Sequence, residues 1–175
     1  PSVNIFERSP QFYGRVSGLF YLALAVDGIF GLLYVPSQII VLDDASETVS
    51  NIIANETLFR MGIVSELLTQ VIFIFLGLAL YKILSIVDRN QAVLMVVLVI
   101  VSVPIAMLNQ INPIAILLVL NNPDLTALAP ETLVQFFLDL QQIGIDIASI
   151  FWGLWLFPFG YLVYRSDFLP KILGI

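Results

Sequence analysis

Long apolar runs separated by short polar segments form the main pattern along this chain. A helix needs about 20 predominantly apolar residues to cross a hydrocarbon core of about 30 Å. Four runs meet this requirement: residues 16–35, 61–84, 92–120 and 143–164. The pattern therefore predicts an all-α fold, a multi-pass transmembrane helical bundle with four spans in a single domain.

The third run is longer than one crossing requires. It contains the sequence Asn109-Gln110-Ile111-Asn112-Pro113 near its middle. Neither half has room for a further crossing and a turn. We therefore expect one helix, which bends here or projects outward past the bilayer.

The segments between the runs carry helix-start and turn signals. Asp44 and Glu47, three residues apart, have the spacing of a capping box. They predict a short helix through Ile53, lying outside the membrane between the first two spans. Pro130 suits the first position of a helix, which would extend the fourth span outward. Residues 121–126 are rich in turn-forming residues and predict the turn of an outer hairpin.

Composition excludes most other classes of protein. Of 175 residues, 59% are hydrophobic and 11% are charged, and the mean hydropathy is +1.00. Ordinary soluble domains are about 45–50% apolar and about 25% charged. The chain is therefore expected to be an integral membrane protein whose first partner is the lipid bilayer. Its net charge of −6 argues against nucleic acid as a partner.

The chain contains neither cysteine nor histidine. It therefore lacks the thiolate nucleophile, the commonest general base and the commonest haem ligand. We predict no catalytic residues, no metal site and no cofactor, and we expect that the protein is not an enzyme.

Basic residues are distributed unevenly among the loops. In a four-span arrangement, six of the seven would fall on one side of the membrane: Arg8, Arg15, Lys82, Arg89, Arg165 and Lys171. The opposite loops are acidic, with Arg60 as their one cation. The positive-inside rule then predicts that both ends of this chain lie in the cytoplasm.

Polar and small residues form one stripe on each of two spans, at the helical repeat of 100° per residue. In the second span the stripe comprises Gly62, Glu66, Thr69, Gln70, Phe73, Gly77 and Tyr81, and in the fourth Gln135, Asp139, Gln142, Asp146, Ser149, Gly153, Gly160 and Tyr164. Such stripes favour close helix packing with interhelical hydrogen bonds, so we expect both to face inward. In the first span, Asp27 lies almost opposite a stripe of small residues. That span is expected either to have neighbours on two sides or to offer Asp27 to a partner chain.

These stripes suggest a polar cluster within the membrane, mainly in its outer half. Its candidate members are Asp27, Arg60, Glu66, Gln70, Asn109, Gln142 and Asp146. We expect Arg60 to be the cation available to Glu66 or Asp146. Three interpretations remain open: polar contacts that fix helix packing, a site that handles a proton or solute, and contacts with another subunit.

Several motifs resemble an uncharacterised bacterial membrane family, domain of unknown function 4386. They are the run from Asp43 to Ile63, Gly14-Arg15 with Tyr21-Leu22, Ala79-Leu80-Tyr81, and the closing run with Phe151-Trp152-Gly153, Gly160-Tyr161-Leu162 and the sequence from Tyr164 to Gly174. The resemblance implies a bundle of membrane helices in the bacterial inner (plasma) membrane and no particular activity. Members usually continue with a further pair of hydrophobic segments, so the resemblance implies a shortened member or part of a longer chain.

Two functions follow as hypotheses. The first is a structural or accessory subunit of a larger membrane complex, formed with other membrane subunits or by self-association. The alternative is a small transporter or channel-like protein that uses the polar, acidic site in the outer half of the bilayer.

Overall fold

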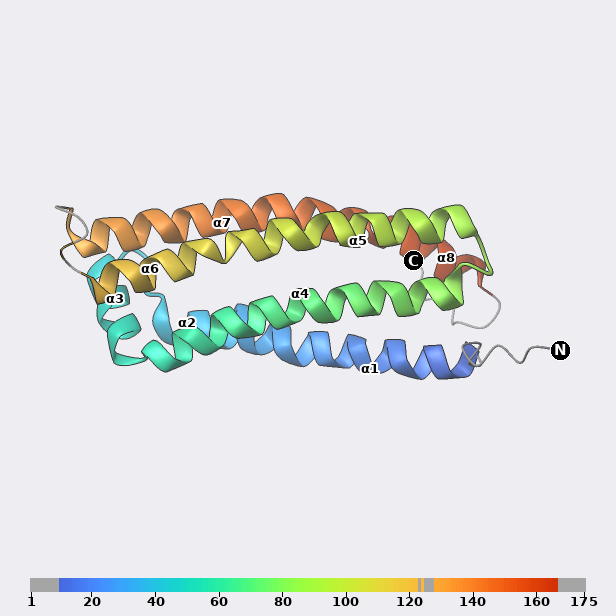
Figure 1. Ribbon diagram of the computed structural model, residues 1–175, viewed down its shortest axis with the longest axis horizontal. Coiled ribbons are helices and arrows are strands. Elements are labelled where there is room, and N and C mark those ends of the chain that lie inside the picture. Colours follow the sequence, from blue (N-terminus) through green and yellow to red (C-terminus); the bar gives the residue numbers. More distant parts are fainter. Residues whose placement is uncertain (1–9, 123, 125–127, 167–175) are drawn as a thin grey trace. The chain divides into compact units, whose positions relative to one another are not determined.

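The computed structural model describes residues 10–122, 124 and 128–166, which are helical with short connections and contain no strand. The helices, in order, are α1 (Pro10–Gly28), the π-helix η1 (Ile29–Tyr34), α2 (Val35–Ile39), α3 (Ala45–Ala54), α4 (Glu56–Leu84), α5 (Arg89–Asn109), α6 (Ile111–Asn121), α7 (Pro130–Leu154) and α8 (Leu156–Arg165) (Figure 1). Four helical stretches are long and apolar enough to cross a membrane: Phe12–Ile39, Glu56–Leu84, Arg89–Asn121 and Pro130–Arg165. The predicted all-α fold with four spans is confirmed.

The chain forms two compact units. Unit 1 comprises Pro1–Leu24, Val71–Val103 and Ile150–Ile175, and unit 2 comprises Ala25–Gln70 and Pro104–Ser149. The single domain stays a prediction. Unit 2 contains ten of the acidic residues and a single basic one, Arg60, whereas the described basic residues of unit 1 are Arg15, Lys82, Arg89 and Arg165. The uneven charge pattern of the sequence thus coincides with the division into units.

Prolines explain two of the helix breaks. Proline has no N–H, and its ring clashes with the carbonyl group four residues earlier. Asn109, the last residue of α5, lies four residues before Pro113, and Leu154, the last residue of α7, lies four residues before Pro158. The structure divides the third predicted span into α5 and α6 at Gln110, within the sequence where a bend was predicted.

The first span changes from an α-helix to the wider π-helix η1 where Gly31 lies against α4. The inward positions of the first span recur at intervals of four residues: Asp27, Gly31, Val35 and Ile39. Asp27 is half-buried, and the other three are buried. In an α-helix of 3.6 residues per turn, a four-residue repeat drifts around the axis. The wider turns of η1 compensate for this drift, since a π-helix pairs residues five apart. The segment thereby keeps one face directed inward.

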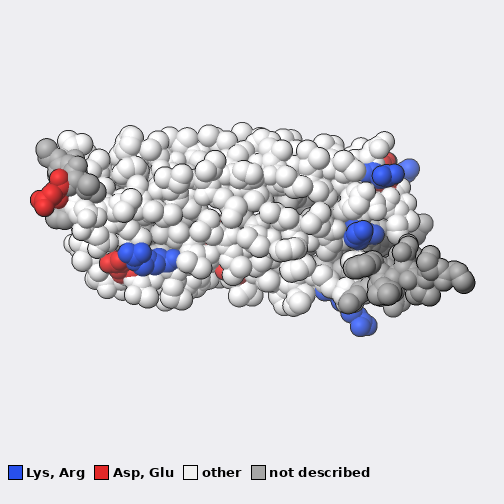
Figure 2. Space-filling model, viewed as in Figure 1, with Lys and Arg blue, Asp and Glu red and all other residues white. Residues whose placement is uncertain are grey.

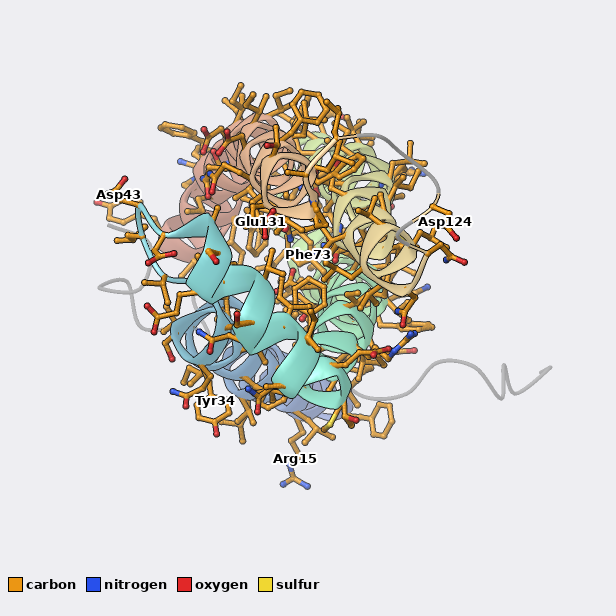
Figure 3. All side chains as sticks on the ribbon, turned by 90° about the vertical axis from the view of Figure 1, so that its left-hand side faces the viewer. Arg15, Tyr34, Asp43, Phe73, Asp124 and Glu131 are labelled. Carbon is orange, nitrogen blue, oxygen red and sulfur yellow. The ribbon has the colours of Figure 1, made fainter. Side chains whose placement is uncertain are left out.

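The short helix α3 covers one end of unit 2. Asp44 accepts a hydrogen bond from the Glu47 N–H (2.8 Å), which confirms the predicted N-cap. The hydroxyl of Thr48 pairs with the backbone N–H (3.0 Å) and carbonyl group (3.2 Å) of Val41. Figure 3 shows α3 lying across this end of unit 2, at which Asp43, Asp124 and Glu131 also lie.

Apolar packing stabilises each unit. The core of unit 2 contains Val35, Ile39, Val49, Ile52, Phe59, Ile63, Ile116, Leu117 and Val134. In unit 1, the ring of Phe73 meets that of Trp155 edge-to-face at a centroid distance of 5.2 Å. Most of the surface visible in Figure 2 carries neither an acidic nor a basic side chain, as lipid contact requires.

Candidate functional site

A carboxyl group of the first span is held by hydroxyl groups of α4. Ser65 donates a hydrogen bond to one carboxyl oxygen of Asp27 (2.6 Å), and Thr69 donates to the other (2.5 Å). Ser65 and Thr69 are four residues apart and therefore share a face of α4. Asp27 is thus bound within unit 2, whereas no atom lies within 4 Å of a Cβ added at Gly14, Gly18 or Gly28 on the small-residue stripe of the first span.

Glu66 follows Ser65 on α4 and, unlike Asp27, has a carboxyl oxygen without a hydrogen-bond donor. Its Oε1 atom is buried and has no hydrogen-bond partner. A Cβ atom added to Gly31 would lie 2.8 Å from Glu66 Oε1 and 3.0 Å from Ser65 Oγ. Glycine at position 31 therefore lets the first span approach α4 closely enough to bring the two acidic residues into one region.

A second unsatisfied oxygen belongs to Gln110, at the break between α5 and α6. The side chain is 5% exposed, and its Oε1 atom is buried without a partner. Glu66 and Gln110 line the same cavity of about 50 Å³, together with Gly31, Gly62, Pro113 and Gln141. A buried acceptor without a donor costs about 1–3 kcal/mol, so two such atoms at one cavity indicate a place for a donor or a cation.

Asn109 has a structural role next to this cavity. Its amide N–H donates to the carbonyl group of Gln141 (2.8 Å), and its Oδ1 atom accepts from Asn112 (2.9 Å). A Cβ atom at Gly144 would collide with this amide group. Asn109 therefore joins α5 to α7 at a point where only glycine fits on α7.

The polar stripe of α4 faces inward as predicted. Gly62, Gln70, Phe73 and Gly77 are buried, whereas the opposite face is exposed, with Val64, Leu68, Val71, Phe75 and Leu78. Gln70 is 3% exposed, and its Oε1 atom lacks a partner.

The prediction for the fourth span is wrong. Gln135, Asp139, Gln142, Asp146 and Ser149 all lie on the exposed face of α7. Gln135 donates to Asp139 (2.8 Å) and Gln142 donates to Asp146 (2.9 Å), so the stripe pairs with itself along one helix. Buried positions of α7 are instead Val134 and Ala148, because the helix approaches its neighbours through its opposite side. The face formed by these five residues is called the outer polar face below.

The expected role of Arg60 is also wrong. Its guanidinium group pairs with Glu56, one turn earlier on α4, at 2.6 Å, and both side chains are exposed. Because α4 begins at Glu56, four residues before Arg60, the helix itself provides the counter-ion. Glu66 and Asp146 are therefore not neutralised by Arg60.

The structure thus divides the predicted cluster. Asp27 and Glu66 come together, Gln142 and Asp146 lie on the outer polar face, and Arg60 is paired elsewhere. Gly31, Ser65 and Thr69 were not predicted as neighbours of the carboxyl groups, and Gln110 was not predicted as a cavity residue. Among the described residues, no three His, Cys, Asp or Glu side chains are grouped to hold a metal ion.

Comparison with known families identifies the class of this protein. Residues 16–175 match the model of the domain of unknown function family DUF4386. The chain therefore belongs to that family, as its motifs predicted. No curated protein and no solved structure matches it.

Proposed function

We propose that this membrane protein is an accessory subunit of a larger membrane assembly, which it contacts through the outer polar face of α7. The observation behind the proposal is that Gln142, Asp146 and Ser149 are exposed on a helix otherwise suited to lipid. Asp146 and Ser149 lie within the fourth apolar helical stretch, Pro130–Arg165. Polar side chains within such a stretch favour contact with another helix.

Charge indicates the kind of partner. Unit 2 contains ten acidic residues and one basic residue, and that residue, Arg60, is paired with Glu56. A second copy of unit 2 would therefore bring like charges to the outer polar face. The partner that fits is a different membrane protein whose helix presents Lys, Arg or amide donors near the outer surface.

Site-specific cross-linking tests this role directly. A photoactivatable residue at Gln142 or Ser149 should capture one membrane protein in native membranes. The same residue at Val64 or Leu68, on the lipid-facing side of α4, should not. Equal capture at all four positions, or no protein copurifying in mild detergent, contradicts the proposal. Capture of a second copy contradicts the partner chemistry.

The distribution of charged residues in the sequence supports an orientation with both ends of this chain in the cytoplasm of a bacterial cell and the acidic loops outside. The chain lacks cysteine, so single cysteines can be introduced without background. An impermeant thiol reagent added to intact cells should label a cysteine at Ser46 and not one at Asn90. The reverse labelling would invert the topology.

A small transporter or channel-like protein is the second candidate. The observation in its favour is the pair of acidic residues within two candidate spans, Asp27 and Glu66, beside a cavity. Flux of an ion into proteoliposomes, abolished by Glu66→Gln and retained in Asp146→Asn, would support it over the subunit role. Absence of flux for every ion tested would reject it.

A further inference from the structure

The cavity next to Glu66 has an unusual set of polar groups. Two of its lining residues present buried oxygen atoms without a donor, Glu66 Oε1 and Gln110 Oε1. Ser65 and Thr69, the hydroxyl groups nearby on α4, are already directed to Asp27. The site therefore offers acceptors to something that is not part of unit 2.

Charge balance narrows the choice of ligand. Arg60 is the one basic residue in the sequence of unit 2, and it forms an ion pair with Glu56. Asp27 is stabilised by two hydroxyl donors, while Glu66 forms no ion pair with any basic residue that the structure describes. One carboxylate and one neutral amide oxygen match a single positive charge, and hard cations prefer such oxygen ligands.

The volume of the cavity further limits the choice of ligand. A cavity of about 50 Å³ exceeds the space that one water needs, about 10–15 Å³ on the same measure, but is too small for an organic solute. Gln110 stands where α5 ends and α6 begins, and residues at such helix breaks provide oxygen ligands for ions within membranes. We propose that this cavity binds a monovalent inorganic cation, with Glu66 and Gln110 as ligands and Na⁺ as its first probe.

The inference is independent of the docking role of α7, because the two sets of residues do not overlap. Binding of ²²Na⁺ to the purified full chain in lipid nanodiscs should be saturable and fit one site. Glu66→Gln should weaken binding at least tenfold, and Gln110→Leu should weaken it in the same direction. Asp146→Asn, on the outer polar face, should leave it unchanged.

A second measurement, made on the unmodified protein, tests the proposal even if the variants fold poorly. The unfolding temperature of the unmodified protein should rise when NaCl replaces choline chloride at constant ionic strength, because a ligand that binds only the folded state stabilises it. Displacement of ²²Na⁺ by Li⁺ or K⁺ supports the proposal. The proposal is overturned if the unmodified protein shows no saturable Na⁺ binding, if folded Glu66→Gln binds as well, or if Mg²⁺ displaces Na⁺ equally.

Discussion

Two helices of this protein carry polar stripes with the same periodicity but opposite orientations. The stripe of α4 is directed inward, where Ser65 and Thr69 bind Asp27. The stripe of α7 is exposed, and Gln142 pairs with Asp146 on the same helix. Periodicity therefore groups residues on a face correctly, but it does not determine whether that face meets protein or lipid.

The positions of close-packed glycines explain the difference. On α4, Gly62 and Gly77 lie on the polar stripe and contact Val35 and Val99 through the space that a side chain would fill. On α7, the corresponding glycine is Gly144, which meets Asn109 and lies about 200° around the helix from Gln142. Since lipid tails are as apolar as leucine, close packing rather than apolarity decides which side faces a neighbour.

The largest expected effect comes from filling the glycine that orients α7. Gly144→Ala should lower the free energy of unfolding by about 2–4 kcal/mol, because the new methyl group displaces Asn109 and breaks its hydrogen bonds. Thermal unfolding in detergent measures this effect. Gly153→Ala is the matched control, since no atom lies within 4 Å of its added Cβ, and it should be neutral or slightly stabilising. Equal effects of the two substitutions would contradict this account of α7.

Next in size is the loss of a donor to the buried carboxyl group. Thr69→Val keeps the shape of the side chain but leaves one oxygen of Asp27 without a donor, which should cost about 1.5–3 kcal/mol of stability. Ser149→Ala removes an exposed hydroxyl group that bonds only to its own helix, and should change stability by less than about 0.5 kcal/mol. A double-mutant cycle of Thr69→Val with Asp27→Asn tests the contact directly. Strict additivity would exclude coupling between these residues.

The outer polar face should matter for assembly rather than for folding. Gln142→Leu with Asp146→Leu should change the stability of the isolated chain by less than about 0.5 kcal/mol per site, since both residues are exposed. The same double variant should lose the partner captured in native membranes. Val64→Ala with Leu68→Ala, on the exposed face of α4, should retain it. A double variant that keeps its partner would remove the functional distinction between the two helices.

The smallest effect is expected at the exposed ion pair of α4. Arg60→Ala should cost only about 0.3–0.5 kcal/mol, because the pair with Glu56 is exposed and four residues apart. Glu56→Ala should cost about the same, and the double variant no more than their sum. A loss above about 2 kcal/mol in Arg60→Ala would restore Arg60 as a counter-ion of Glu66.

Most of the fold could be predicted from local signals in the sequence. Apolar run length located the four spans, Asp44 and Glu47 located the start of α3, and Pro113 marked the break in the third span. Each signal acts within a few residues, so no tertiary information was needed. The family resemblance agreed with this architecture.

The candidate site was less accessible to prediction because it depends on contacts between distant segments. Asp27 and Ser65 are 38 positions apart, and only the close approach at Gly31 joins them. Arg60 was expected to pair with Glu66 or Asp146 because it was the one cation near them in the predicted arrangement, but α4 begins at Glu56, one turn before Arg60. The available signal for Gln110 was its place three residues before Pro113, where a helix break leaves polar groups unpaired.

The π-helix in the first span makes the chain sensitive to length at this point. One residue added to an α-helix rotates everything beyond it by about 100° around the axis. Deleting one residue within Ile29–Tyr34 would leave Asp27 and Val35 seven positions apart, and an ordinary α-helix places such residues within about 20° of each other, so both would still face their neighbours. Adding one residue there would instead turn Val35 away from its neighbours. Descendants of this gene should therefore lose a codon between Asp27 and Val35 more readily than they gain one.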